Sequence, residues 1–288
     1  MLRPAGRNDT WVAVRRGEHA CCRFANTRDR RRLAEAFVLN GLLRGHKVLY
    51  LRANGHADLA GELATALAGE GADVEAAIDR GQLDVRAAHD YYIPDGRFDA
   101  EHTLAAARRE RELARAQGYP ALSIAGEMSW LDDALPGGDE LREYERRFAS
   151  LIEDGDMVAL CQYDAGAHVP RGMLDDVAAA HDVDLSPELA ALGRSGPLSA
   201  ARVEHGRVLR LAGELDFLSA DALATVLDAH FPGPLTVDLA DLGFVDVTGL
   251  RALRGRHGRT LTIASASDAV RRLLVLLAWD TDPAVMVD

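Results

Sequence analysis

Residues 27–51 read TRDRRRLAEAFVLNGLLRGHKVLYL and join two kinds of periodicity. Apolar side chains recur at helical spacing over residues 33–43, and Gly45 follows at the point where a helix would end. The next run, KVLYL at residues 47–51, is short and apolar, which is typical of a buried strand. A helix followed at once by a buried strand is the repeating unit of a parallel α/β sheet.

The same alternation continues along the first two thirds of the chain. We predict further strands at residues 20–24, 83–85, 121–126 and 157–163, and further helices at residues 58–68, 99–117 and 140–152. This order of elements predicts one α/β domain that is built on a parallel sheet.

A second, smaller α/β domain is predicted near the C-terminal end. The segment RSGPLSAA at residues 194–201 is small and poor in apolar bulk, so we expect a flexible joint there. We place the boundary inside it, which gives domains over residues 1–195 and 196–288. In the second domain we predict strands at residues 203–204, 207–211, 235–239 and 260–264, and helices at residues 219–231, 248–256 and 268–279.

Composition and charge argue against a nucleic-acid-binding or membrane-spanning protein. The chain carries 33 Lys and Arg against 45 Asp and Glu, a net charge of −12, so the phosphates of nucleic acid would be repelled. The longest purely apolar run, residues 273–279, is far shorter than the roughly 20 residues of a membrane span. With no apolar leader near Met1 and an odd number of cysteines, we expect a cytoplasmic protein with reduced thiols, without nucleic-acid or membrane partners.

Two segments of the second domain carry a longer pattern. They are LAGELD at residues 211–216 and TVDLADLGFVDVTGL at residues 236–250. Together they resemble a STAS domain, and the resemblance covers residues 203 to about 280. Such domains occur in bacterial anti-sigma factor antagonists, so the resemblance implies an anti-sigma factor or a related kinase as partner. The residues that it assigns to partner binding are Asp216, Asp246, Val247, Thr248 and Gly249.

The usual phosphorylation switch of that family is altered in this sequence. In the family, a serine that a partner kinase phosphorylates usually follows the aspartate of the motif, and here that position is Val247. Thr248 carries the only hydroxyl within residues 243–250 and is the candidate phosphorylation site, although a Thr or Asp at a helix start often serves only as an N-cap. We therefore expect the output of the STAS domain to be set mainly by the domain attached to it.

In the first domain, residues 27–51 resemble the first helix and second strand of a RecA-like ATPase, but the phosphate loop is missing, because no G-x-x-x-x-G-K-[ST] occurs. It resembles the MEDS family over about residues 17–181. The motifs that carry this resemblance are GEHAC (17–21), GLLRG (41–45), GQL (81–83), GEMSW (126–130), YE (144–145) and LCQYD (160–164). The resemblance implies a degenerate nucleotide fold that senses a small molecule, whose identity the residues do not reveal.

Candidate ligand-binding residues follow from the position of clefts in such sheets, at the carboxyl ends of the strands. Glu127, Met128, Trp130 and Tyr163 are predicted there and mix apolar walls with polar groups. Trp130 can equally anchor the core. A carboxylate such as Glu127 is costly to bury unless it is paired or faces a cleft. His19 and Cys21, on the first strand, complete the set of candidate ligand-binding residues.

His19, Cys21, Cys22 and Cys161 also raise the question of a metal or redox site. Their spacing matches no known zinc pattern, and the adjacent cysteines would point to opposite faces of a strand. Buried cysteines are most often inert, small apolar residues. We therefore predict no metal and no cofactor.

The predicted function is that of a signalling regulator without catalysis, in which a small-molecule sensor acts on a STAS module. One alternative is an enzyme that uses Glu127, although no nucleophile elbow or metal motif supports it. A second is a scaffold without ligand, which would have no reason to keep Glu127 unpaired. A homodimer is one candidate for the oligomeric state.

Overall fold

The computed structural model describes residues 13–53, 61, 63, 65, 72–132, 134–166, 172–190, 192, 197–204, 206–255 and 258–287. The chain forms two compact units, Val14–Asp184 and Leu185–Asp288, the second of which includes Ala13. The predicted fold class, an α/β domain built on a parallel sheet followed by a small α/β domain, is confirmed by the order and pairing of the elements. In the part of the chain that the structure describes, no helix is both long and apolar enough to cross a membrane.

A parallel sheet forms the centre of the first unit. Its strands lie in the order β6-β1-β5-β4-β2-β3, and every neighbouring pair in this order is parallel. The strand bounds are β1 His19–Phe24, β2 Lys47–Arg52, β3 Leu83–Ala87, β4 Leu122–Glu127, β5 Met157–Asp164 and β6 Val183–Asp184.

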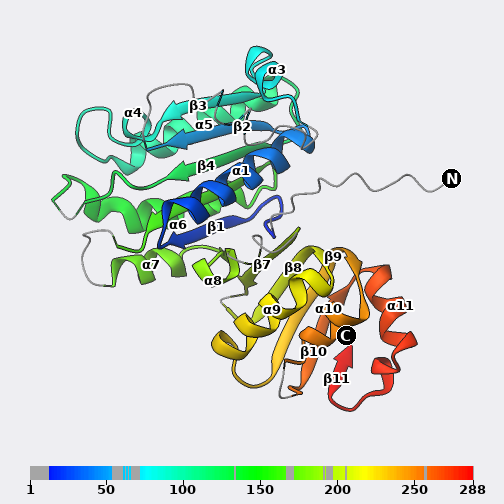
Figure 1. The fold of residues 1–288 in the computed structure, drawn as a ribbon. Coiled ribbons are helices and arrows are strands. Elements are labelled where there is room, and N and C mark those ends of the chain that lie inside the picture. Colours follow the sequence, from blue (N-terminus) through cyan, green and yellow to red (C-terminus); the bar gives the residue numbers. More distant parts are fainter. Residues whose placement is uncertain are drawn as a thin grey trace. The chain divides into compact units, whose positions relative to one another are not determined.

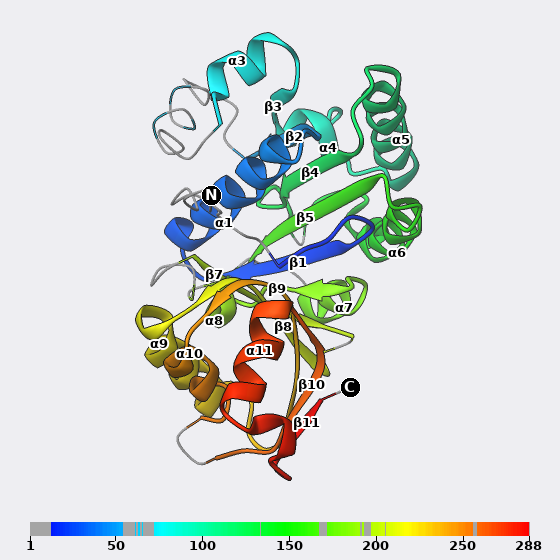
Figure 2. The same ribbon diagram turned by 90° about the vertical axis from the view of Figure 1, so that its right-hand side faces the viewer.

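Helices cover both faces of this sheet. Figure 2 shows α1 (Thr27–Leu43) on one face, and α5 (Ala100–Ala116) and α6 (Leu141–Ile152) on the other. The shorter helices are α3 Val74–Asp79, α4 Ala88–Tyr92, η1 Gly138–Glu140 and α7 Met173–Ala179. Gly45, with φ of 72°, turns the chain after α1, as the sequence predicts. The helix predicted at residues 58–68 lies largely outside the described residues.

The strands of the second unit lie in the order β11-β10-β9-β8-β7. The β7–β8 pair is antiparallel and the other pairs are parallel. Figure 1 and Figure 2 both show α9 and α10 side by side, and these two helices contact each other. The bounds are α8 Pro187–Ala190, β7 Leu198–Val203, β8 Val208–Leu215, α9 Phe217–His230, β9 Leu235–Val245, α10 Val247–Ala252, β10 Leu261–Ala266, α11 Asp268–Leu276, η3 Trp279–Thr281 and β11 Val285–Val287.

The flexible joint predicted at residues 194–201 is wrong over its second half. Residues from Leu198 onward form β7, which pairs with β8 along its whole length. Leu198, Ala200, Ala201 and Val203 are all buried in it. Small side chains are typical of a linker, but here they belong to a strand that packs closely within the unit.

Candidate functional site

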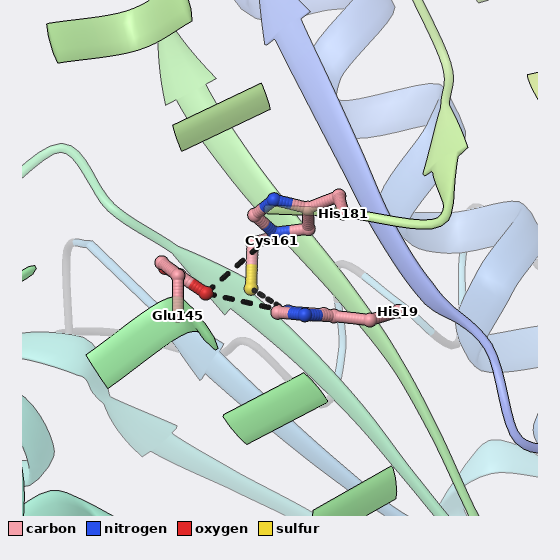
Figure 3. Close-up of side chains that lie close together, drawn as sticks. All are labelled: His19, Glu145, Cys161 and His181. Carbon is pink, nitrogen blue, oxygen red and sulfur yellow. Dashed lines mark hydrogen bonds and ion pairs between the residues drawn. The ribbon is translucent and has the colours of Figure 1, made fainter. Parts of the chain in front are cut away.

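Four polar side chains from distant parts of the sequence converge inside the first unit (Figure 3). Strand β1 carries His19, and the neighbouring strand β5 carries Cys161, which lies opposite Cys21 in the parallel register. Helix α6 presents Glu145 from above the same face of the sheet. His181 follows α7 and precedes β6. We call these four residues the His19 cluster.

The ligand-type atoms of the His19 cluster lie within 4.8 Å of one another. His19 Nε2 lies 3.3 Å from the Sγ of Cys161 and 3.4 Å from Oε2 of Glu145. The same Oε2 atom lies 3.6 Å from Nε2 of His181. The four side chains therefore point toward one shared space.

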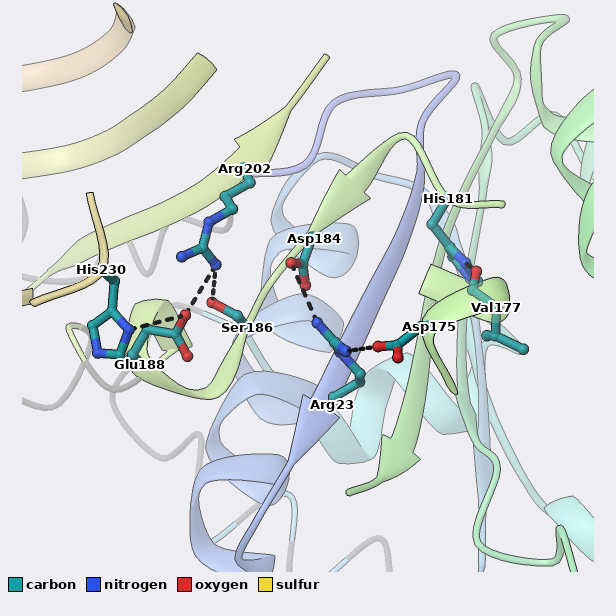
Figure 4. A network of polar contacts seen from close by, with 9 residues as sticks. All are labelled: Arg23, Asp175, Val177, His181, Asp184, Ser186, Glu188, Arg202 and His230. Atoms are coloured by element: carbon teal, nitrogen blue, oxygen red, sulfur yellow. Dashed lines mark hydrogen bonds and ion pairs between the residues drawn. The ribbon is translucent and has the colours of Figure 1, made fainter. Parts of the chain in front are cut away.

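The cluster is closed to solvent, and some of its polar atoms have no partner. His19 and Glu145 are 0% exposed, Cys161 is 3% and His181 is 7% exposed. The Tyr163 hydroxyl donates to Oε1 of Glu145, and Nδ1 of His181 lies 2.7 Å from the carbonyl oxygen of Val177 (Figure 4). Oε2 of Glu145, Nε2 of His181 and Nδ1 of His19 make no hydrogen bond among the contacts that the structure describes.

Burial shifts the pKa of every member in the direction that favours its neutral form. Desolvation lowers the pKa of His19, with a further contribution from His181, and lowers the pKa of His181 to about 4. Desolvation raises the pKa of Glu145 to about 8, although the Tyr163 hydroxyl opposes this rise, and it raises the pKa of the Cys161 thiol. Without an added positive charge, the cluster is a set of neutral groups in an apolar surrounding.

The candidate ligand-binding residues predicted from the sequence do not all meet. His19, Cys21 and Tyr163 lie on the α6 face of the sheet, where Cys21 and Tyr163 belong to the buried core. Trp130 stacks between Tyr92 and Phe98, with ring centroids 5.0 and 5.2 Å away, and Met128 is buried in the same core. Their assignment to a ligand stays a prediction.

Glu127 lies on the opposite face of the sheet, beneath α1. Its Oε1 accepts a hydrogen bond from the Tyr50 hydroxyl at 2.6 Å, and its Oε2 accepts from Arg30 Nη1 at 2.7 Å. The backbone N–H of Ala53 also donates to Oε2, at 3.0 Å. The carboxylate is 1% exposed and paired at both oxygens, so of the two expected states, paired or facing a cleft, the structure shows the paired one, and the assignment of Glu127 to a ligand stays a prediction.

Two members of the His19 cluster, Glu145 and His181, were missed as site residues by sequence reasoning. The signal for Glu145 is its place in α6, whose buried residues Leu141, Tyr144, Phe148 and Ile152 follow helical spacing around it. A carboxylate within an apolar stripe points to a specific role, because its burial is costly unless a charge or a hydrogen bond compensates it. His181 lies in a short connection, where no periodicity marks it.

The candidate partner-binding residues of the second unit lie where α9 and α10 begin. Asp216 caps α9 in a capping box with Ser219. Asp246 caps α10 by accepting from the N–H of Gly249 at 2.7 Å, and its other oxygen accepts from the N–H of Phe217 at 3.0 Å. Asp246 therefore links the starts of both helices, and it, rather than Thr248, supplies the cap.

The surface around these caps is apolar and exposed. Phe217 is 65% exposed, Leu218 58% and Phe244 49%. Thr248 is exposed beside them, whereas Val247 is half-buried. We call Phe217, Leu218, Phe244 and Thr248 the α9–α10 surface. Exposed large apolar side chains gathered near one point are typical of protein-binding sites.

Comparison with known proteins agrees with this division of the chain. Residues 18–182 match the model of the MEDS family, described as the methanogen/methylotroph, DcmR sensory domain. The chain belongs to the MEDS family. C-terminal to the MEDS domain, residues 198–288 match a family described as Mlab, STAS domain, which confirms the resemblance to a STAS domain. No curated protein matches the chain.

Two crystal structures show distant likeness to the MEDS protein. The KaiC-like protein PH0186 of the hyperthermophilic archaeon Pyrococcus horikoshii OT3 is 13% identical, with 66% of this chain and 79% of that chain covered at a TM-score of 0.42. The flagellar accessory protein FlaH of Methanocaldococcus jannaschii is 11% identical, with 60% of this chain and 72% of that chain covered at a TM-score of 0.42.

The two family matches together bear on the role of the chain. A sensory domain and a protein-binding STAS domain in one chain indicate a signalling role.

Proposed function

We propose that this protein is a non-catalytic cytoplasmic regulator in which the MEDS domain senses a small molecule and the STAS domain binds an anti-sigma factor or a related kinase. The observation that carries the proposal is the α9–α10 surface, which presents exposed apolar side chains beside the motif that resembles the family's partner-binding segment. A STAS domain without a partner would have no need to leave Phe217 and Leu218 in water.

The residues at this surface also bear on whether phosphorylation could switch the domain. Val247, at the position of the family's usual serine, has no hydroxyl to accept a phosphoryl group. Thr248 is exposed and is not needed as the helix cap, so it stays the candidate phosphorylation site. A phosphate there would add roughly 1.5 to 2 negative charges next to Asp246 and oppose docking through repulsion and desolvation.

Substitution of Phe217 with serine is expected to weaken binding of an anti-sigma factor kinase at least tenfold, because buried aromatic anchors dominate interface energies. The fold should not change, since the Phe217 contact with Asp246 uses the backbone N–H alone. The measurement is calorimetric titration of the full chain with the purified kinase from the same source.

The matched control is Leu276→Ser on α11, where an 80% exposed leucine lies outside the α9–α10 surface. Equal loss of affinity in both variants, or no loss in Phe217→Ser, would count against this surface as the docking site.

The sensory part of the proposal predicts that one class of small metabolite raises the melting temperature of the full chain. A ligand at 100 times its dissociation constant stabilises the folded state by about 2.7 kcal/mol. Thermal shift across a metabolite panel measures this, with hydrogen exchange assigning the protected segment to the MEDS or the STAS domain. A panel in which protection falls only on the STAS domain would refute the sensor assignment.

A further inference from the structure

The geometry points to a transition-metal site of the zinc class in the His19 cluster, formed by Nε2 of His19, Oε2 of Glu145, Sγ of Cys161 and Nε2 of His181. This site goes beyond the proposed function, and it requires neither the STAS partner nor the small-molecule ligand. Imidazole, thiolate and carboxylate are the donors with which proteins bind Zn²⁺, commonly as four ligands in tetrahedral geometry.

The spacing of the donor atoms fits such an ion. With metal–ligand bonds of about 2.0 to 2.3 Å, the donors of a tetrahedral site lie about 3.3 to 3.8 Å apart. The separations from His19 Nε2 to Cys161 and Glu145, 3.3 and 3.4 Å, fall in that range, as does the 3.6 Å from Glu145 to His181. All four donors lie within 4.8 Å of one another, so the wider pairs would draw closer around a bound ion. Figure 3 shows the four side chains directed at one another.

The unsatisfied atoms are a second, independent observation. Oε2 of Glu145 and Nε2 of His181 are buried, and each faces the shared space without a hydrogen bond. A buried polar atom without a hydrogen bond destabilises the folded state, so a cluster with several such atoms is costly unless something else binds them. One cation would satisfy both atoms at once.

Two of the four donors, Glu145 and His181, are oriented by groups behind them, as outer-shell groups do in metal sites, whereas Nδ1 of His19 makes no hydrogen bond among the described contacts. The backbone carbonyl of Val177 accepts from Nδ1 of His181, which leaves the lone pair of Nε2 free to face the cluster. The Tyr163 hydroxyl holds Oε1 of Glu145 and leaves Oε2 as the donor. Hydrogen bonds of this kind fix the tautomer and the ring orientation of a metal-binding histidine.

Charge balance also favours a divalent ion. One thiolate and one carboxylate carry two negative charges, and two neutral imidazoles carry none. A divalent cation therefore makes the buried site neutral, which avoids the cost of an uncompensated charge in the core. Four protein donors leave no open position for water, so the site is of the structural type rather than the hydrolytic type.

Such an ion would tie together segments that the sequence separates widely. Its ligands come from β1, α6, β5 and the connection before β6. His181 lies three residues before Asp184, where the first unit ends. Occupancy of the site would thus fix the last segment of the MEDS domain to its central strands.

The test measures zinc per chain in protein purified without a histidine tag and, after exchange, the absorption spectrum of the Co²⁺ form. We expect about one equivalent of zinc and a tetrahedral Co²⁺ spectrum with a thiolate charge-transfer band. Cys161→Ser and His181→Gln should each lower zinc affinity at least about 100-fold in competition with a chromophoric chelator, since loss of outer-shell partners alone costs 10- to 100-fold.

Cys22→Ser is the matched control, because Cys22 is equally buried but adjacent to Cys21 and so on the other face of β1. It should keep both the zinc and the charge-transfer band. Wild-type protein without zinc affinity, a Co²⁺ spectrum without that band, or equal loss in Cys22→Ser would overturn the proposal.

Glu145→Gln keeps the test valid if the other variants fold poorly. A glutamine can still accept from Tyr163 and can donate to Nε2 of His181, so the melting temperature of the metal-free protein should stay equal or rise. Its zinc affinity should nevertheless fall at least about 100-fold. A variant that binds zinc as the wild type does would show that the carboxylate is not a ligand and would refute the four-donor site.

Discussion

Gly249→Ala is expected to destabilise the STAS domain by about 3 kcal/mol, the upper end of the usual cost of overpacking. A β-carbon at this position would lie 2.2 Å from the carbonyl oxygen of Leu215 and 2.6 Å from its carbonyl carbon. Those atoms belong to the end of β8, where the backbone cannot move aside without losing its pairing with β9. The measurement is urea unfolding of the full chain, with hydrogen exchange of β8 and β9 to locate the loss.

Gly243→Ala is the control for this prediction. The nearest atom to a β-carbon at Gly243 is the Gly213 carbonyl oxygen at 3.8 Å, an ordinary contact, so the change should cost under about 1 kcal/mol. If the two variants unfold at the same urea concentration, the close approach of α10 to β8 is not as the structure gives it.

Arg30→Met is expected to cost the MEDS domain about 3 kcal/mol, because it leaves the Glu127 carboxylate buried without its counter-charge. Breaking a buried ion pair by removing one partner costs about 3 to 5 kcal/mol, and the lower end applies here since Tyr50 and the Ala53 N–H still donate. The Arg30 side chain is 14% exposed, so water compensates little of the loss. Thermal unfolding of the full chain measures the effect.

Two further variants test whether the loss caused by Arg30→Met is electrostatic. Arg31→Met removes an ion pair with Glu35 in which the arginine is 45% exposed, so it should change stability by less than about 0.5 kcal/mol. The double variant Arg30→Met with Glu127→Gln should recover part of the loss, because a neutral amide needs no counter-charge. Equal destabilisation by the single and double variants would contradict an electrostatic origin.

Local sequence patterns predicted most of the fold because the spacing of apolar residues within an element shows which of its faces is buried. The apolar runs that became β2, β4 and β5 and the periodic segments that became α1, α5 and α6 were located to within a few residues. Strand β7 was missed because its Ser and Ala residues have no strong preference for strand, and its burial comes from pairing with β8. The tripeptide β11 was too short to show any alternation.

The site was less predictable than the fold, for a physical reason. His19 and Cys161 stood out as residue types, but their proximity depends on β5 pairing directly with β1 across more than a hundred residues of sequence. Glu145 and His181 join them only through the packing of α6 and of the connection after α7. The same limit applies to Glu127, whose partners Arg30 and Tyr50 come from a helix and a neighbouring strand.

The lack of space at Gly249 changes what its motif can tell about other sequences. Any chain that carries this helix start against the end of the same strand must keep a glycine there for steric reasons, whether or not a partner ever docks. The glycine is thus required by the architecture, and its presence alone does not show that a partner binds. Partner choice has to be encoded by neighbours whose side chains reach solvent, and these can vary freely while the motif itself stays intact.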